Sequence, residues 1–288
     1  MTTGAVFDRR AANLPYQQRA LVAFLKATRM PEADRFPHSS PINVGGRMYQ
    51  AKAVQEALRS YVSEERMARI ADVVAGRTYS VVAVLEGLHD AGNLHAVLRS
   101  SEGLGYGATF VVAPEGDAAS LLEPYLVGED VSTEELGRRG STRAAQGAHK
   151  WLDLSVWPTA NEFVRSARSR GYAIVATHLD ADAIPMSDWD FTQPTALVFG
   201  NEKDGVSDVL LAHADANVVL PIDGFIQSYN VSVAVALALY HARQDRLARQ
   251  GFLGDLTQEE QAILTAQYYL RSVAAAEQIL SRERGDGK

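Results

Sequence analysis

The stretch that decides the fold is SVVAVLEGLHDAGNLHAVLRSSEGLGYGATFVVAP, residues 80–114. It begins with a β-branched apolar run, continues as the amphipathic segment NLHAVLRSSEGLG and ends in a second apolar run. This order predicts a strand, a helix and a second strand. The alternation returns in WLDLSVW, NEFVRSARSRG, YAIVATHL, TALVFG and ANVVLPI. Continuous apolar strands separated by helices predict an α/β fold with a mostly parallel sheet and helices on both faces.

Helical segments flank the predicted sheet. Apolar residues recur at helical spacing in 16–28 and in 51–74, which predicts one helix in each, and the segment 31–47 between them is expected to be a loop or linker. After the sheet, residues 227–251 predict a long helix ended by a glycine, and TQEE at 257–260 predicts a capping box that begins another. We therefore expect a helical N-terminal extension at 1–75, a central domain at 76–250 and a helical tail at 251–288, with RERGDGK at its frayed end.

Composition narrows the classes of function. The 288 residues contain no cysteine, which excludes disulfide scaffolds and thiolate metal sites, and the seven histidines show no metal-binding spacing, so we expect no metal. The longest apolar run, Val233–Tyr240, is far below the roughly 18 residues of a membrane span, and the first residues lack a signal pattern. We expect a soluble, cytoplasmic protein.

Charge is unevenly distributed along the chain. Residues 1–75 carry 11 Lys and Arg against 7 Asp and Glu, a balance of +4, whereas the remainder balances at −11 in a chain of net charge −7. This asymmetry permits a polyanion site in the N-terminal part, although solvated helix faces explain it equally well.

Three polar segments follow strand ends, where open α/β sheets bind ligands. The first is NLHAVLRSSEGLG at 93–105, in which Asn93 is placed to cap the predicted helix and Arg99 has a structural role as its default interpretation. The second is FGNEKDGVS at 199–207, and the third is LPIDGFIQSYNVSVAVAL at 220–237. A dinucleotide site is not predicted, because the pattern that begins at Gly103 runs from helix to strand, the reverse of the required order.

Together and in this order, the three segments resemble the three motifs of the SpoU/TrmH branch of the SPOUT RNA 2′-O-ribose methyltransferases, closest to the tRNA guanosine-18 enzymes. The likeness extends to VVAVLEGLHDAGN, GAHKW, ATHL and PTALVFG, and covers most of residues 62–250. It implies a C-terminal trefoil knot, S-adenosylmethionine as cofactor and a homodimer.

The resemblance also implies site residues. Arg99 matches the arginine at the reacting 2′-hydroxyl; because arginine is almost always protonated, we expect it to bind the adjoining phosphate and stabilise the alkoxide rather than act as a base. Glu202 is expected to hold the loop geometry and Arg99, and Asn230 and Ser232 to fix the geometry of the site. Asn93 begins the first motif and is expected to be structural as much as catalytic. The expected cofactor-binding residues are Thr177, Gly200, Gly205, Leu220, Ser228 and Tyr229.

The expected substrate is tRNA, at a guanosine of the D-loop, and the alternatives are an rRNA 2′-O-methyltransferase or an RNA-binding protein that has lost catalysis. Tyr229 stands where leucine is usual and Asn201 where alanine is common, which suggests a subtly altered cofactor pocket. Phosphate ligands are expected among basic residues of two regions, namely Arg138, Arg139, Arg143 and Lys150, and Arg9, Arg10 and Arg19.

Overall fold

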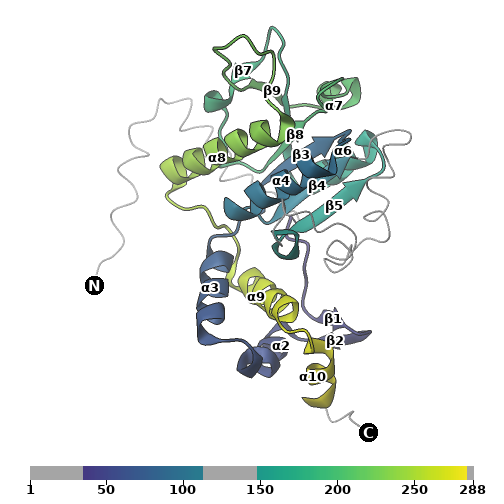
Figure 1. Ribbon diagram of the computed structural model, residues 1–288, viewed down its shortest axis with the longest axis vertical. Helices are drawn as coiled ribbons and strands as arrows, with labels where there is room; N and C mark the ends of the chain where they lie inside the picture. Colours follow the sequence, from purple (N-terminus) through teal and green to yellow (C-terminus); the bar gives the residue numbers. More distant parts are fainter. Residues whose placement is uncertain (1–34, 113–147, 284–288) are drawn as a thin grey trace. The chain divides into compact units, whose positions relative to one another are not determined.

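A computed structural model describes residues 35–112 and 148–283, which belong to one compact unit (Figure 1). Its centre is a seven-stranded sheet with the order β5-β4-β3-β8-β6-β9-β7, in which every pairing is parallel. The strands are β3 (Val81–Glu86), β4 (Ala108–Val112), β5 (Asp153–Trp157), β6 (Ala173–Thr177), β7 (Ile184–Pro185), β8 (Thr195–Phe199) and β9 (Ala216–Val219). The predicted α/β class with a parallel sheet is confirmed.

Helices cover both faces of this sheet. Alternate residues of β3 enter different core clusters: Val82 and Val84 enter one, whereas Val81, Ala83 and Leu85 enter the other. The second cluster is closed by α4 (Ala91–Gly103) and α8 (Val231–Gln250), which lie side by side in Figure 1. The first contains side chains of α6 (Ala160–Ser169) and α7 (Asp208–Ala212). Burial on both faces explains why the strands are continuously apolar.

The predicted helix over 51–74 is interrupted. The structure has α2 (Ala51–Leu58), a 3-10 turn η2 (Arg59–Tyr61) and α3 (Glu64–Ala75). Val62 is extended, and the Ser63 side chain accepts a hydrogen bond from the Arg66 amide, so a new N-cap begins within the apolar pattern. The predicted helix over 16–28 lies outside the described residues.

The segment predicted as a loop or linker contains a small hairpin. Strands β1 (Ile42–Val44) and β2 (Arg47–Tyr49) pair in antiparallel register around Gly45 and Gly46, both of which have positive φ. A two-residue turn with positive φ at both positions is the one that matches strand twist, and glycine adopts it without strain. The Gly-Gly pair was the signal for this hairpin.

The C-terminal helices pack on the N-terminal ones. Helix α9 (Gln258–Ser272) contacts α2 and α3, and α10 (Ala276–Glu283) contacts α2. The capping box at Thr257 and the end of α8 at Gly251, with φ +85°, are both as predicted. The core cluster that contains Val82 and Val84 of β3 also contains residues of these helices. The division at 75 and 250 stays a prediction, as does the trefoil knot.

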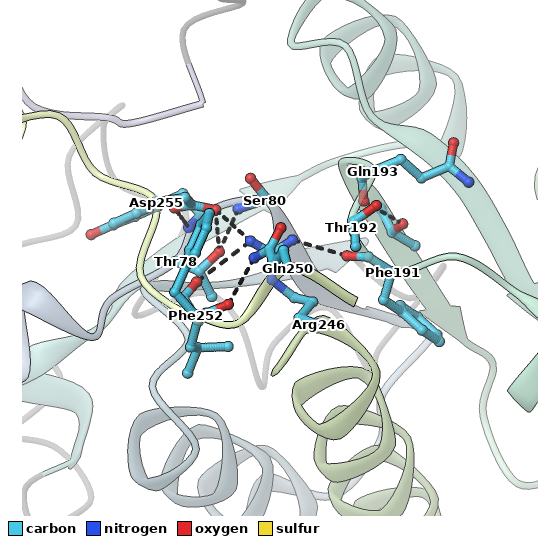
Figure 2. Close-up of polar contacts among 12 residues, drawn as sticks. Thr78, Ser80, Phe191, Thr192, Gln193, Arg246, Gln250, Phe252 and Asp255 are labelled. Carbon is cyan, nitrogen blue, oxygen red and sulfur yellow. Dashed lines mark hydrogen bonds and ion pairs between the residues drawn. The ribbon is translucent and has the colours of Figure 1, made fainter. Parts of the chain in front are cut away.

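Two buried arginines connect elements around the start of the sheet. Arg77 donates to the Tyr268 hydroxyl, to the Glu102 carboxylate at 3.0 Å and to the carbonyls of Glu102, Tyr106 and Trp151. Arg246 of α8 donates to the Phe191 carbonyl at 2.9 Å and to Asp255 at 3.0 Å, and Asp255 also accepts the Thr78 hydroxyl (Figure 2). These contacts join the segment before β3, helix α8 and the segment that leads into α9.

No helix in residues 35–112 and 148–283 is both long enough and apolar enough to cross a bilayer. The same residues contain no cluster of three or more His, Asp or Glu side chains arranged to hold a metal ion.

Candidate functional site

The three polar segments meet at the carboxyl edge of the sheet, that is, where its parallel strands end. Strands β3, β8, β6 and β9 are consecutive neighbours and parallel, so the loops that follow them leave from the same edge. The loop after β3 leads into α4, the loop after β8 contains Gly200–Ser207, and the segment after β9 leads into α8. This is the edge at which open α/β sheets bind ligands.

A chain of side-chain hydrogen bonds connects these loops. The Asn93 amide nitrogen donates to Glu202 Oε1 at 2.8 Å, and the Asn230 amide nitrogen donates to Asn93 Oδ1 at 3.2 Å. Asn230 caps α8, since its Oδ1 accepts from the backbone amide of Ser232 at 2.9 Å and from the Ser232 hydroxyl at 2.6 Å. Four of the five residues predicted to be catalytic therefore form one continuous network.

One expectation about this network needs correction. Asn93 does not cap α4, because Asp90 is the N-cap and its carboxylate accepts the Gly92 and Asn93 amides. Asn93 lies in the first turn, which leaves its side chain free to bridge Glu202 and Asn230. Glu202 binds Asn93, which lies on the same helix as Arg99. The expected role of Glu202 towards Arg99 stays a prediction.

The loop Gly200–Ser207 has little freedom. A Cβ on Gly200 would lie 1.9 Å from the Gly205 carbonyl carbon, so only glycine fits there, and Gly205 has φ +72°. Asn201 Oδ1 accepts the amides of Lys203 and Asp204, which makes a side-chain-stabilised turn. The Asn201 side chain therefore stabilises the backbone of its own loop.

Glu86, at the end of β3, is a site residue that sequence reasoning missed. Its carboxylate accepts the Ser207 amide at 2.8 Å and the Ser207 hydroxyl at 2.6 Å, and Ser207 also caps α7. The contact fixes the far end of the loop against the end of β3. A carboxylate that directly follows five apolar strand residues was the available signal.

The predicted cofactor residues lie along the ends of β6, β8 and β9. The Thr177 hydroxyl donates to the Val198 carbonyl at 2.9 Å, and the Tyr229 hydroxyl donates to the Pro221 carbonyl at 2.9 Å. Leu220 packs against the core cluster of the α4 and α8 face, whereas Ser228 is exposed. Both hydroxyls use their donor on a carbonyl, so towards a ligand they can act only as acceptors.

Arg99 is separate from the hydrogen-bond network. It is exposed, and within the described residues it makes no hydrogen bond or ion pair. It lies six residues after Asn93 on α4, about 9 Å along the helix axis. It borders an open hollow between α4 and α8 with Ala236 and Tyr240. A guanidinium with no partner in the described part of the chain is available to an anion.

Most of the predicted phosphate ligands lie outside the described residues: Arg9, Arg10, Arg19, Arg138, Arg139 and Arg143. Lys150 is described and exposed, in the 3-10 turn η5 (Ala148–Trp151), and its carbonyl accepts Arg271 Nη1 at 3.2 Å.

The fold and the grouped loops define a class: a parallel α/β protein in which three loops, one of them dependent on glycine, meet at the carboxyl ends of the strands. Residues 80–240 match the model of the SpoU rRNA Methylase family, and the chain belongs to this family. It is 35% identical to a tRNA (guanosine(18)-2′-O)-methyltransferase of Thermus thermophilus over 185 residues, which are 64% of this chain and 85% of the relative. The enzyme of that name from Escherichia coli K12 is 30% identical over 181 residues, 63% of this chain and 70% of the relative.

Among solved structures, the A. aeolicus TrmH/SpoU tRNA modifying enzyme superposes with a TM-score of 0.60 at 27% sequence identity, covering 73% of this chain and 98% of that one. The predicted membership of the SpoU/TrmH family is therefore confirmed.

Proposed function

We propose that this chain transfers a methyl group from S-adenosylmethionine to a ribose 2′-hydroxyl of RNA, with a guanosine in the D-loop of tRNA as the leading substrate. The observation that carries the proposal is the hydrogen-bond chain from Glu202 through Asn93 to Asn230, which unites the three motif segments. The names of the relatives from Thermus thermophilus and Escherichia coli support the substrate. The alternatives are an rRNA target and an RNA-binding protein without catalysis.

The residues at the sheet edge fit the cofactor. A methyl group added at Gly205 or Gly224 would meet no atom within 4 Å, so the backbone there is open to a ligand. The groups that would hold it come from Thr177, Gly200, Leu220 and Tyr229, with their backbone amides and carbonyls as recognition elements. S-adenosylmethionine supplies a methyl group on a sulfonium centre when it is bound.

In the reaction, the residues at this edge would hold the ribose hydroxyl in line with the methyl group that the bound cofactor would supply, and the hydroxyl proton would leave to solvent. Arg99 binds the adjoining phosphate and stabilises the negative charge that develops on the oxygen. Asn93, Glu202 and Asn230 hold α4 and the cofactor loops in register, and Ser232 keeps Asn230 in its capping geometry. Holding the reacting groups in line lowers the entropic part of the barrier.

We also propose that the chain works as a homodimer. Val233, Leu237 and Tyr240 form an apolar stripe on α8 that is 46%, 44% and 56% exposed, next to the hollow that contains Arg99. Residues four and three positions apart lie on one helix face, so the stripe is continuous. A second copy covering it would enclose the Arg99 hollow. Light scattering of the purified protein tests this, and a monomer at micromolar concentration would exclude it.

The test of the reaction is incubation with labelled S-adenosylmethionine and total tRNA or rRNA, followed by mapping of modified nucleotides. We expect a 2′-O-methyl nucleotide in tRNA. Arg99→Lys keeps the charge but loses the planar fork, and we expect kcat to fall about 100-fold. Because Arg99 is exposed, stability should change by less than about 0.5 kcal/mol. Methylated base atoms, or near-normal turnover of Arg99→Lys, would contradict the assignment.

Cofactor binding has its own pair of variants. Gly200→Ala introduces a Cβ that overlaps the Gly205 carbonyl carbon, so the loop must move, and we expect S-adenosylmethionine binding to weaken at least tenfold by calorimetry. Gly76→Ala is the matched control, because Gly76 lies outside the three loops and its Cβ would meet only ordinary contacts at 3.6 Å or more, so affinity should stay within twofold. Equal affinities of the two variants would exclude a role for this loop.

A further inference from the structure

A pocket of about 100 Å³ lies at the other end of α4, away from the three loops. Its volume is several times the roughly 15 Å³ that one water needs. It is lined by residues of α3, α4, η5 and α9, namely Arg66, Arg69, Val73, Glu102, Trp151 and Tyr268, together with the buried Ile70. None of these residues belongs to the site described above.

The pocket combines an aromatic wall with a cationic rim. The guanidinium of Arg66 lies 4.8 Å above the Trp151 ring, and Tyr268 meets Trp151 edge to face at 5.2 Å between ring centroids. Arg66 and Arg69 are exposed, and in the described part of the chain neither has a carboxylate partner. Exposed arginines beside aromatic rings are typical of sites that bind nucleic-acid bases and their phosphates.

One carboxylate faces this pocket. Glu102 is paired with the buried Arg77 at 3.0 Å, and its side chain is 29% exposed. The ion pair fixes one carboxylate oxygen, and the second oxygen remains an acceptor for a ligand. Among the RNA bases, guanine offers two adjacent N–H donors on its Watson–Crick edge, which suits a carboxylate best.

The pocket is within reach of the reacting centre. Arg99 and Glu102 are three residues apart on α4, about 4.5 Å along its axis, and therefore on neighbouring positions of the helix surface. An RNA strand whose reacting ribose lies at Arg99 can direct another of its nucleotides towards α3. Helix α4 thus links the two sites rigidly.

We propose that this pocket binds an unstacked guanine nucleotide of the RNA substrate and so helps to select the RNA. The inference rests on the proposed function, because it requires an RNA ligand. The base stacks on the Arg66 guanidinium beside Trp151, the Glu102 carboxylate accepts its N–H groups, and Arg69 binds a flanking phosphate.

The test uses fluorescein-labelled RNA heptamers, either all uridine or with one central guanosine or adenosine, and the full chain. By anisotropy, we expect the guanosine heptamer to bind about tenfold tighter than the uridine one, and Trp151→Leu to abolish this preference. The double variant Arg66→Ala, Arg69→Ala should weaken binding of all heptamers and reduce the slope of log Kd against log salt by about 0.7 to 1.4.

Arg165→Ala on α6 is the matched control, since Arg165 is also exposed and lies outside the pocket; it should leave affinity and salt slope unchanged. The Arg66→Ala, Arg69→Ala double variant still tests the pocket if Trp151→Leu fails to fold. No guanosine preference in the wild type, or a double variant that binds like Arg165→Ala, would overturn the pocket. Methyl transfer by the same preparations is measured separately, and its absence in the wild type would instead overturn the proposed function.

Discussion

The sheet has an amino edge, where its parallel strands begin, and a carboxyl edge, where they end. The two edges differ in how their polar side chains are buried and paired. At the amino edge, Arg77 is fully buried, and the side chain of Asp153 at the start of β5 is 14% exposed. Each of the two side chains makes several hydrogen bonds and ion pairs. Asp153 accepts the Tyr79 hydroxyl at 2.6 Å and pairs with His38 at 2.9 Å and Arg271 at 3.3 Å. At the carboxyl edge, Asn93 and Glu202 interact through a hydrogen bond that is open to solvent.

This contrast separates stability from function. A buried polar network is strong because the surrounding dielectric is low, and breaking it leaves charges without partners. An exposed hydrogen bond exchanges with water and contributes little to folding. We therefore expect substitutions at the amino edge to lower the free energy of unfolding, and substitutions at the carboxyl edge to lower activity.

Arg77→Met gives the largest expected loss of stability. It leaves Glu102 without its cation and removes donors from three carbonyls and from Tyr268. We expect the free energy of unfolding to fall by about 3–5 kcal/mol in urea titrations. Arg246→Met is the comparison, because in the described residues the Arg246 Nε is already buried without a partner, and its loss should be smaller. A larger loss for Arg246→Met would reverse this ranking.

The second prediction concerns acid stability. Burial alone would raise the pKa of Asp153, but His38, Arg271 and the hydrogen bonds from His38 and Tyr79 lower it to about 2, below its ordinary 3.8. A depressed folded-state pKa stabilises the fold above about pH 4, and this stabilisation is lost as the pH falls towards 2. The contribution is about 2 kcal/mol.

Asp153→Asn removes this titration. Between pH 5 and pH 3, its free energy of unfolding should fall less than that of the wild type, as measured by urea titration at each pH. Asp72→Asn, on the exposed side of α3, should keep the wild-type pH dependence. If Asp153→Asn and the wild type lost stability in parallel, the ion pairs of Asp153 would be unimportant for folding.

Local signals predicted the parallel sheet, the end of α8 and the start of α9. Gly251 adopts the left-handed conformation that ends a helix, and Thr257 forms the capping box that its neighbours encode. The strands were visible because burial on both faces requires unbroken apolar runs. These features depend on residues close in sequence.

Contacts between distant residues could not be predicted in this way. His38 and Asp153 are 115 residues apart, and Arg77 and Tyr268 are 191 apart, and neither pair has a periodic pattern. In the candidate site, the grouping of Asn93, Glu202 and Asn230 was expected only from a family resemblance. Which of them bonds to which followed from the geometry, and Asp90 took the capping role because its carboxylate reaches two amides.

Among the variants that compare the two edges, Asn93→Ala gives the smallest expected change in stability. It removes the link between Glu202 and Asn230, but solvent can replace both hydrogen bonds, so the free energy of unfolding should fall by no more than about 1 kcal/mol. Turnover should nevertheless fall at least tenfold, because α4 carries Arg99 and loses its register with the cofactor loops. Ser169→Ala on α6 is the control, since among the described residues its hydroxyl bonds only to the Ser166 carbonyl. If Asn93→Ala lost stability as Arg77→Met does while turnover per folded molecule stayed normal, the carboxyl edge would be structural, and the separation between the two edges would be wrong.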